Sequence, residues 1–378
     1  MRGAAALAVV CCHFFVPEMS SIATTLNSIF PDPIPTLARH GDLGVEVFFV
    51  LSGFVIAFSI GNQRISGRFA ANFALRRSIR LDPPYLTTLA LSMLLWAAYL
   101  PGGLMECYER SHEWKGMLAN AFYLQDVLGF PSTIGVAWTL CLEIQFYLVY
   151  ICLFSLSQYL SDSWGTSGQF NRLNSDASQT ALLITFLPFA VASVYWWNTN
   201  LSDFSVFGSW HRFFIGVLCY WTYSRQISSP IFTAFIVALA GLAIHSGDLR
   251  AGTAVVTALL IHLAGRTGHL STALSGPWLQ YLGRVSYSLY LVHIMVGVSL
   301  VNFLWRADQS IFITLCLLGV GLIASLIGAE LMYRFFELPS VRLSRNFKGT
   351  TCDRSVSPSS CPPSPLHIGP TAESAANR

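Results

Sequence analysis

Charged residues are scarce in this sequence. Asp, Glu, Lys and Arg make up 11% of its 378 residues, whereas an ordinary soluble domain contains about 25%. Hydrophobic residues account for 53% of the chain, and the mean hydropathy is +0.54. So few charges do not cover a water-exposed surface, and so apolar a composition is not typical of a disordered chain. The composition therefore predicts a membrane protein.

The sequence also lacks a strong excess of one charge and a metal-binding cysteine pattern. The net charge is +3, and no basic stripe alternates with aromatic residues, so nucleic acid is not an expected partner. Most of the nine cysteines lie inside apolar runs, and no Cys-x-x-Cys pair occurs. We therefore expect neither a metal site nor a disulfide framework. No internal repeat is evident, which argues against the duplicated architecture of many transporters.

Ten apolar segments are candidate membrane spans, because a span needs about 20 mostly apolar residues. They run near 3–16, 44–60, 84–100, 137–157, 181–197, 206–223, 230–245, 251–265, 282–304 and 311–333. The first also has the composition of a signal peptide, but no small-x-small cleavage site follows it directly. The expected fold class is all-α, a polytopic membrane bundle of about ten transmembrane helices over residues 1–345. The Ser- and Pro-rich tail, 346–378, is expected to be disordered and cytoplasmic.

The placement of Lys and Arg predicts the orientation of the bundle. Five arginines lie between the second and third segments, and positive charge gathers on the cytoplasmic side of membrane proteins. With that loop inside, both termini are cytoplasmic, and 16 of the 22 Lys and Arg residues lie on the inner side. We therefore expect a multi-pass protein of the cell membrane. The loops 17–43 and 101–136 then face outward.

Ionisable side chains inside spans are costly and commonly functional. The first segment contains Arg2 and His13, 11 residues apart. At 100° per residue this separation is close to three full turns, so both side chains share one helix face, roughly 16 Å apart along the axis. The alternative is an arginine that anchors the helix end and a histidine bonded to a neighbouring helix.

The second segment and the loop after it contain further candidates. Glu46 and the pair Ser52-Gly53 lie in the second segment, where the small residues also suit close helix packing and the glutamate suits snorkelling. Three arginines, Arg76, Arg77 and Arg80, precede the third segment, whose start is marked by Pro83-Pro84. Guanidinium groups bind phosphate oxygens in pairs. The alternative reading of this cluster is a topology signal.

The fourth and ninth segments contain the remaining candidates. Glu143 lies about one and a half turns inside the fourth segment, behind Trp138 at the interface, and so at a depth similar to that of His13. A carboxylate beside an imidazole orients the ring and stabilises its protonated form. The ninth segment is dense in hydroxyls and contains Ser286, Tyr290 and His293. These side chains suit a substrate or hydrogen bonds between helices equally well.

Together these segments resemble the acyltransferase family 3 of integral membrane acyltransferases. The resemblance covers nearly the whole span region and is carried by six motifs in order. They are Arg2-Gly3 through His13; Gly44-Val45-Glu46-Val47-Phe48-Phe49 with Ser52-Gly53-Phe54; Arg76-Arg77, Arg80-Leu81 and Pro83-Pro84-Tyr85; Trp138-Thr139-Leu140 with Glu143 and Gln145-Phe146-Tyr147; Leu282-Gly283 with Ser286-Tyr287-Ser288-Leu289-Tyr290-Leu291 and His293; and Glu337, Pro339 and Arg342.

The resemblance implies an enzyme that transfers an acyl group, most often acetyl from acetyl-CoA, to a hydroxyl of a glycan or other acceptor. On this reading His13 is the general base or transient acyl carrier and Glu143 orients it. Acyl-CoA is a donor substrate, and no permanently bound cofactor is expected. Residues assigned to binding of acyl-CoA or acceptor are Arg2, Glu46, Ser52, Gly53, Arg76, Arg77, Arg80, Tyr85, Trp138, Ser286, Tyr290 and His293.

Two other functional classes remain open at this point. A transporter or flippase of a glycan or lipid-linked substrate also needs many spans with buried charges, although it usually shows repeats. A non-catalytic scaffold has no need for the aligned Arg2 and His13. The sequence leaves the acceptor, the acyl chain and the oligomeric state undetermined.

Overall fold

The computed structural model describes residues 1–99, 113–166, 176–197, 205–270, 272, 274–306 and 309–346. Within these residues every regular element is a helix, so the expected all-α class is confirmed. The expected tail lies outside the described residues beyond position 346, as do residues 100–112 of the second outer loop.

The helices that match the ten expected segments have the following bounds. They are α1 (Arg2–Phe15), α4 (Gly44–Ile60), α5 (Gly67–Tyr99), α9 (Trp138–Ser161), α10 (Asp176–Ala192), α12 (Val206–Tyr223), α13 (Ser229–Ser246), α14 (Leu249–Arg266), α15 (Pro277–His293) and α17 (Ile311–Met332). Shorter helices connect them: α2 (Ala23–Ile29), α3 (Ile34–Arg39), α7 (Glu113–Ala121), α8 (Gln125–Leu128), α16 (Ser299–Leu304) and α18 (Leu338–Asn346).

Six helical stretches in the described part of the chain are long and apolar enough to cross a membrane. They are Ile34–Ile60, Trp138–Trp164, Asp176–Trp197, Ser229–Ser246, Pro277–Leu304 and Ile311–Asn346, and the shorter α1 is also apolar. The helical membrane bundle is therefore confirmed. The number of about ten spans stays a prediction.

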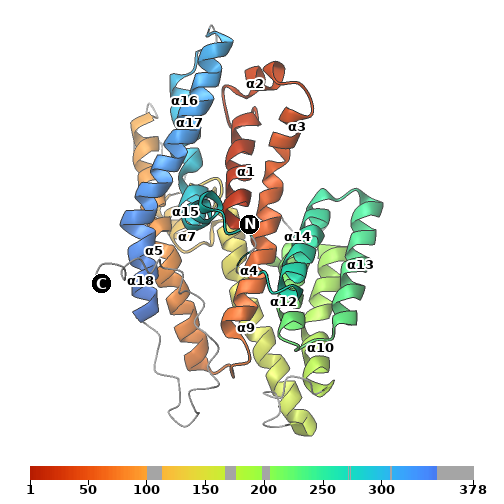
Figure 1. The fold of residues 1–378 in the computed structure, drawn as a ribbon. Coiled ribbons are helices and arrows are strands. Elements are labelled where there is room, and N and C mark those ends of the chain that lie inside the picture. The colour runs from red at the N-terminus through yellow and green to blue at the C-terminus, as the bar shows by residue number, and fades with distance from the viewer. Residues whose placement is uncertain are drawn as a thin grey trace, which may run out of the picture.

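Helices α1 and α4 lie side by side at the centre of the bundle (Figure 1). On one side α15 and α17 pack against α1, and on the other α12 packs along α4, with α14 beside both. The contact between α4 and α12 is close, because a Cβ atom at Gly53 would collide with the Phe213 carbonyl and one at Gly216 with the Val50 carbonyl. Small residues permit such close approach of helices in lipid.

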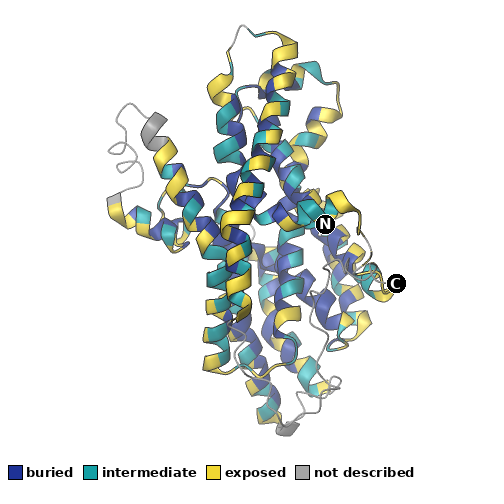
Figure 2. Ribbon diagram, turned by 60° about the vertical axis from the view of Figure 1, so that its left-hand side comes forward, coloured by how far each residue is buried: buried dark blue, intermediate teal, exposed yellow. Residues whose placement is uncertain are grey.

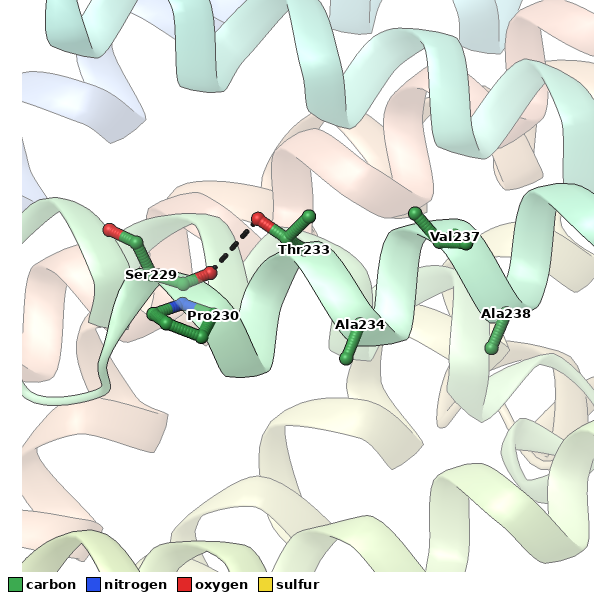
Figure 3. A pocket seen from close by; sticks show the side chains of 6 residues that line it. All are labelled: Ser229, Pro230, Thr233, Ala234, Val237 and Ala238. Atoms are coloured by element: carbon green, nitrogen blue, oxygen red, sulfur yellow. Dashed lines mark hydrogen bonds between the residues drawn. The ribbon is translucent and has the colours of Figure 1, made fainter.

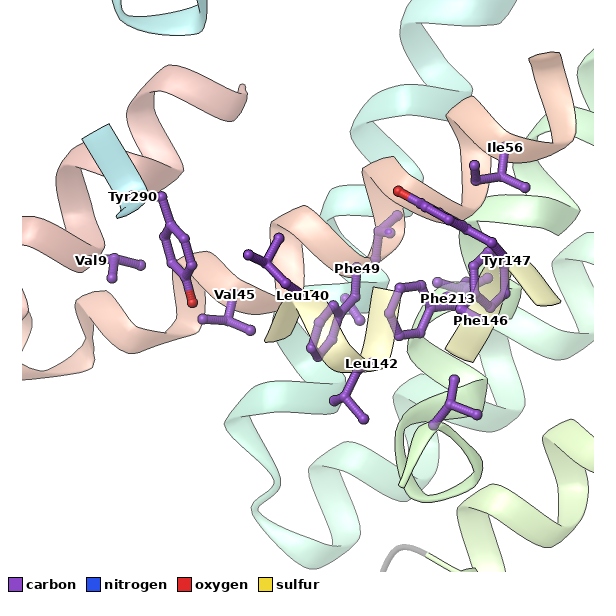
Figure 4. Close-up of a cluster of buried hydrophobic side chains, with 14 of the residues drawn as sticks. Val9, Val45, Phe49, Ile56, Leu140, Leu142, Phe146, Tyr147, Phe213 and Tyr290 are labelled. Carbon is purple, nitrogen blue, oxygen red and sulfur yellow. The ribbon is translucent and has the colours of Figure 1, made fainter. Parts of the chain in front are cut away.

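Buried side chains gather along the centre of the molecule, and exposed ones lie on the outer helix faces (Figure 2). Part of the core is a stack of aromatic rings in which Phe213 of α12 lies 4.5 Å from both Phe49 of α4 and Phe146 of α9, between ring centroids (Figure 4). On the outer faces, apolar side chains such as Ile244 (83% exposed) and Phe312 (75%) have no protein partner to cover them. This surface suits contact with lipid.

The arginine segment before the third span is helical and not a loop. Helix α5 runs without interruption from Gly67 to Tyr99 and includes Pro83 and Pro84. The expectation of a loop was wrong because prolines are tolerated inside membrane helices where neighbouring groups satisfy the backbone. The Tyr287 hydroxyl of α15 donates to the Leu81 carbonyl at 2.8 Å and so ties this part of α5 to α15.

Glu46 has a structural partner that the sequence did not reveal. Its carboxylate lies 3.2 Å from the Arg212 guanidinium of α12, and the two side chains are only 3% and 8% exposed. Arg212 is one of the six Lys and Arg residues that the predicted orientation leaves on the outer side, but it lies inside the bundle. Glu46 therefore contributes to helix packing, and it does not line the cleft described below.

Candidate active site

A cleft opens between the N-terminal end of α1 and the helices α4, α5, α9 and α15. It combines cationic, acidic and hydroxyl side chains with an apolar wall. Its lining consists of Arg2, Val45, Phe48, Phe49, Ser52, Arg77, Arg80, Leu81, Thr139, Leu140, Glu143, Ser286, Tyr287 and Tyr290. Seven of these belong to the residues assigned from the sequence, and they come from five helices that are far apart in the chain.

Three arginines give the cleft its positive charge. Arg2 begins α1, and Arg77 and Arg80 lie one turn apart on α5. Within the described residues none of the three forms an ion pair, and Arg77 lies over the rings of Tyr147 and Phe73 at 5.0 and 5.5 Å. Stacking of this kind fixes a guanidinium without neutralising it. The cleft is therefore suited to an anionic ligand.

Glu143 is the carboxylate of the cleft. The Ser52 hydroxyl of α4 donates to its Oε1 at 3.0 Å, and the Tyr147 hydroxyl, one turn further along α9, donates to the same oxygen. Two hydroxyl donors hold the carboxylate in a defined orientation without adding charge. Ser52 thus acts through Glu143.

His13 lies elsewhere and has a different partner from the one expected. Its Nδ1 is 3.0 Å from Nε2 of His293 and 2.9 Å from the Val9 carbonyl. The expected direct contact between His13 and Glu143 is not formed. The reason is the order of the helices, since α1 packs on α15 and α4 while α9 packs on α10, α12 and α4. A similar depth along two helices did not make them neighbours.

Tyr290 forms the boundary between the cleft and the histidine pair. Its ring lines the cleft, lies 6.0 Å from the His293 ring and meets Phe48 edge-on at 5.8 Å. Its hydroxyl is 2.9 Å from the Thr139 hydroxyl (Figure 4 shows the position of Tyr290). The histidines thus lie directly behind the wall of the cleft. They are not among its lining residues.

Four further residues assigned from the sequence do not line the cleft. Gly53 packs against α12 as described above, and Arg76 lies beside the cleft on α5. Tyr85 is buried, stacks on Tyr123 at 4.2 Å and donates to the Asn120 carbonyl. Trp138 packs edge-on against Phe49. The contacts of Gly53, Tyr85 and Trp138 stabilise the helices around the cleft.

Sequence reasoning missed several polar residues of the site. Thr139 and Tyr287 line the cleft, and Tyr147 holds Glu143. Tyr147 carried a usable signal, because it lies four residues after Glu143 and such residues are neighbours on a helix. Glu337, which accepts a 2.6 Å bond from Ser288, belongs to the sixth motif but was given no role from the sequence.

A second hollow lies on the outer face of α13, and its lining lacks the arginine and glutamate side chains found in the cleft. It is lined by Ser229, Pro230, Thr233, Ala234, Val237 and Ala238 (Figure 3). The Thr233 hydroxyl donates to the carbonyl of its own helix. Its lining contains no ionisable side chain, so the charged cleft is the better candidate. Among the described residues no group of three or more His, Cys, Asp or Glu could hold a metal ion.

Comparison with known proteins agrees with the motifs. The family model of the acyltransferase domain, Acyl_transf_3, matches residues 1–334. This chain belongs to that acyltransferase family. It is a transferase with a helical membrane bundle, and its site residues come from the helices that carry the family-like motifs.

Three curated relatives are acyltransferases by name, and they differ in length. Acyltransferase MdmB of Streptomyces mycarofaciens is 24% identical, over 91% of this chain and 90% of the relative. The putative peptidoglycan O-acetyltransferase YrhL of Bacillus subtilis is 26% identical, and the peptidoglycan O-acetyltransferase OatA of Listeria monocytogenes is 22% identical. Each of these two alignments covers 80% of this chain but only 51% of the relative. No solved structure matches the chain.

Proposed function

We propose that this acyltransferase moves an acetyl group from cytoplasmic acetyl-CoA to a hydroxyl of a glycan outside the membrane. The observation that carries the proposal is the cleft, in which three arginines that form no ion pair with any described residue lie next to the Glu143 carboxylate. Two relatives named as peptidoglycan O-acetyltransferases support acetyl as the group and a glycan as the acceptor.

The arginines provide the binding site for the donor. The phosphates of coenzyme A are anionic, and charge-assisted hydrogen bonds from guanidinium groups are about twice as strong as neutral ones. Arg2 lies at one end of α1 and His13 near the other, about 16 Å apart at 1.5 Å per residue. An extended phosphopantetheine arm has a comparable length. Phosphates bound at Arg2, Arg77 and Arg80 therefore place the thioester near the histidines.

Transfer then needs one base and one leaving group. The His13 imidazole accepts the proton of the acceptor hydroxyl as that oxygen attacks the thioester carbonyl. The new C–O bond forms, the C–S bond breaks, and the imidazolium returns its proton to the departing thiolate. Glu143 faces the cleft with the arginines, so we assign it to orienting the acyl donor and not the histidine ring.

Isolated membranes test the reaction directly. Membranes that contain the chain, incubated with radiolabelled acetyl-CoA, are expected to form base-labile acetyl esters, and those that contain His13→Ala are not. Comparing extracts of cells with and without the chain identifies the acceptor by the acetyl ester that disappears. Equal labelling by the wild type and His13→Ala would contradict the proposal. So would transport of a glycan without ester formation.

Cysteine labelling tests the proposed sidedness. Single cysteines placed near Arg76 and in the loop 17–43 of a cysteine-depleted chain are treated with a membrane-impermeant reagent from outside. We expect labelling only in the loop 17–43. Labelling near Arg76 would remove acetyl-CoA from the proposed side of the membrane.

A further inference from the structure

The two histidines behind the cleft have hydrogen bonds that fix their protonation pattern. Nδ1 of His293 lies 2.8 Å from the Tyr290 carbonyl and 3.1 Å from the Leu289 carbonyl. A carbonyl oxygen only accepts, so this nitrogen carries the hydrogen and donates. In the neutral ring Nε2 is then an acceptor, and it is this atom that lies 3.0 Å from His13.

The same reasoning fixes His13. Its Nδ1 faces two acceptors, the Val9 carbonyl at 2.9 Å and Nε2 of His293. Nδ1 of His13 therefore carries the hydrogen and shares it between them. In the neutral ring this leaves Nε2 of His13 unprotonated, with its lone pair available to accept a proton.

We infer that His293 is the positioning residue for His13, in the place that a carboxylate takes in a serine hydrolase triad. It holds the His13 ring in one tautomer and one orientation with Nε2 as the reactive atom. His293 is 0% exposed, whereas His13 is partly exposed, so only the second ring is placed to meet substrate. The chemical role of Nε2 of His13 rests on the proposed function, whereas the pairing of His13 with His293 rests only on the hydrogen bonds described above.

The pair does not relay a proton further. If His13 gains a proton at Nε2, its Nδ1–H still donates to His293. The Nδ1–H of His293 donates to the backbone carbonyls of Leu289 and Tyr290, and these do not take up a proton. His293 therefore orients His13, and the proton taken from the acceptor stays on His13 until it returns to the leaving group.

The local backbone supports this role of His293. Helix α15 ends at His293, and a π-helical turn, Ile294–Val298, follows directly. Such turns are frequent at functional sites. Close packing fixes the turn against α17, because a Cβ atom at Gly297 would collide with Ser325.

Histidine ¹⁵N NMR on the full-length protein in nanodiscs tests the pairing. The signals of the two rings are assigned by their loss in His13→Gln and His293→Gln, and His262→Gln on α14 is the control that leaves both in place. We expect both rings of the wild type to carry hydrogen on Nδ1. A His13 ring with hydrogen on Nε2, instead of Nδ1, would overturn the inference.

Substitutions at position 293 test its effect on turnover. The amide of Gln reaches the position of Nε2 and supplies an acceptor, whereas the shorter amide of Asn reaches only the position of Nδ1. With acetyl-CoA and N-acetylglucosamine tetramer as probe acceptor, we expect His293→Asn to lower kcat roughly 100-fold, with KM for acetyl-CoA unchanged. His293→Gln is expected to retain activity within roughly tenfold of wild type. Equal kcat for the Gln and Asn variants, both folded, would contradict positioning.

The two proposals fail in different ways. If His13→Gln keeps full transfer while the NMR tautomers are as expected, the proposed role of His13 as the base is wrong and the pairing stands. If His13→Gln abolishes transfer but His293→Asn keeps wild-type kcat, the function stands and the inference about His293 is wrong.

Discussion

Helix α4 contributes to two polar regions with opposite surroundings. At Glu46 the carboxylate is sealed between α4 and α12 and paired with Arg212 at 3.2 Å. At Ser52 the hydroxyl faces the cleft and donates to Glu143, beside arginines that form no ion pair within the described residues. In the region of Glu46 the two opposite charges are paired and buried, whereas in the cleft the guanidinium groups line an open cavity.

The comparison shows what separates a structural charge from a functional one in a membrane bundle. Burying a charge in lipid is costly in both regions. In the sealed region the partner charge offsets that cost, and no ligand can enter. In the cleft Arg2, Arg77 and Arg80 form no ion pair with the described residues, so under the proposed function the anionic donor supplies the opposite charge.

The largest expected effect comes from Glu143, which lines the cleft, and from His13, which lies behind the cleft wall. His13→Ala and Glu143→Gln should each lower acetyl transfer by roughly 10²–10⁴-fold, because proton transfer or donor orientation is lost. Initial rates of label transfer, normalised to the protein present in the membrane, measure this. Both variants should accumulate near wild-type levels. Wild-type turnover in either one would remove that residue from the mechanism.

The next largest effect is expected at the buried Glu46–Arg212 pair, and it concerns the stability of the fold. Glu46→Gln removes the charged partner from the 3.2 Å contact with the buried Arg212 guanidinium, which should lower the free energy of unfolding by about 2 kcal/mol. Thermal unfolding of the purified protein in detergent measures the loss, and activity per folded molecule should not change.

A double substitution sharpens the same point. Glu46→Leu combined with Arg212→Met removes both charges, and such apolar replacements of buried ion pairs are often neutral or stabilising. Recovery of stability in the double variant is therefore expected. A raised KM for acetyl-CoA in Glu46→Gln would instead place Glu46 in the substrate site.

The arginines provide a matched comparison within one helix. Arg77 lines the cleft, whereas Arg76 does not. Arg77→Ala removes a charge-assisted contact to the donor phosphates that is worth about 1.5 kcal/mol. It should therefore raise KM for acetyl-CoA about tenfold and leave the acceptor KM unchanged. Arg77→Lys should restore part of the loss, because an ammonium lacks the bidentate geometry.

Arg76→Ala is the control for this experiment. Its KM for acetyl-CoA should match that of the wild type when rates are measured over a grid of donor and acceptor concentrations. Equal effects of Arg76→Ala and Arg77→Ala would mean that the arginines act only through the general positive charge of α5.

The smallest effect is expected at Tyr85. Its hydroxyl donates to the Asn120 carbonyl at 2.7 Å and lies outside the cleft lining. Tyr85→Phe should cost about 1 kcal/mol of stability and leave both KM values unchanged. A melting curve and a single kinetic series are sufficient. A change in either KM at unchanged stability would indicate that Tyr85 contacts a substrate, as expected from the sequence.

The sequence predicted the helices well but their interruptions poorly. Long apolar runs specify membrane helices, because the backbone must satisfy its own hydrogen bonds in lipid. All ten expected segments contain a helix. The arginine segment around Pro83 was misread as a loop, because proline disfavours helices in water but is tolerated inside helices of a membrane bundle.

By itself the sequence determined the membrane class, the family motifs and the kinds of chemical group that gather in the cleft. Only the tertiary structure decided their partners: Arg212 for Glu46, Ser52 and Tyr147 for Glu143, and His293 for His13. The physical reason is that helical periodicity fixes the face and the depth of a side chain along its own axis. Which helix lies opposite that face depends on packing between segments far apart in the chain, and Gly53 and Gly216 set that packing for α4 and α12.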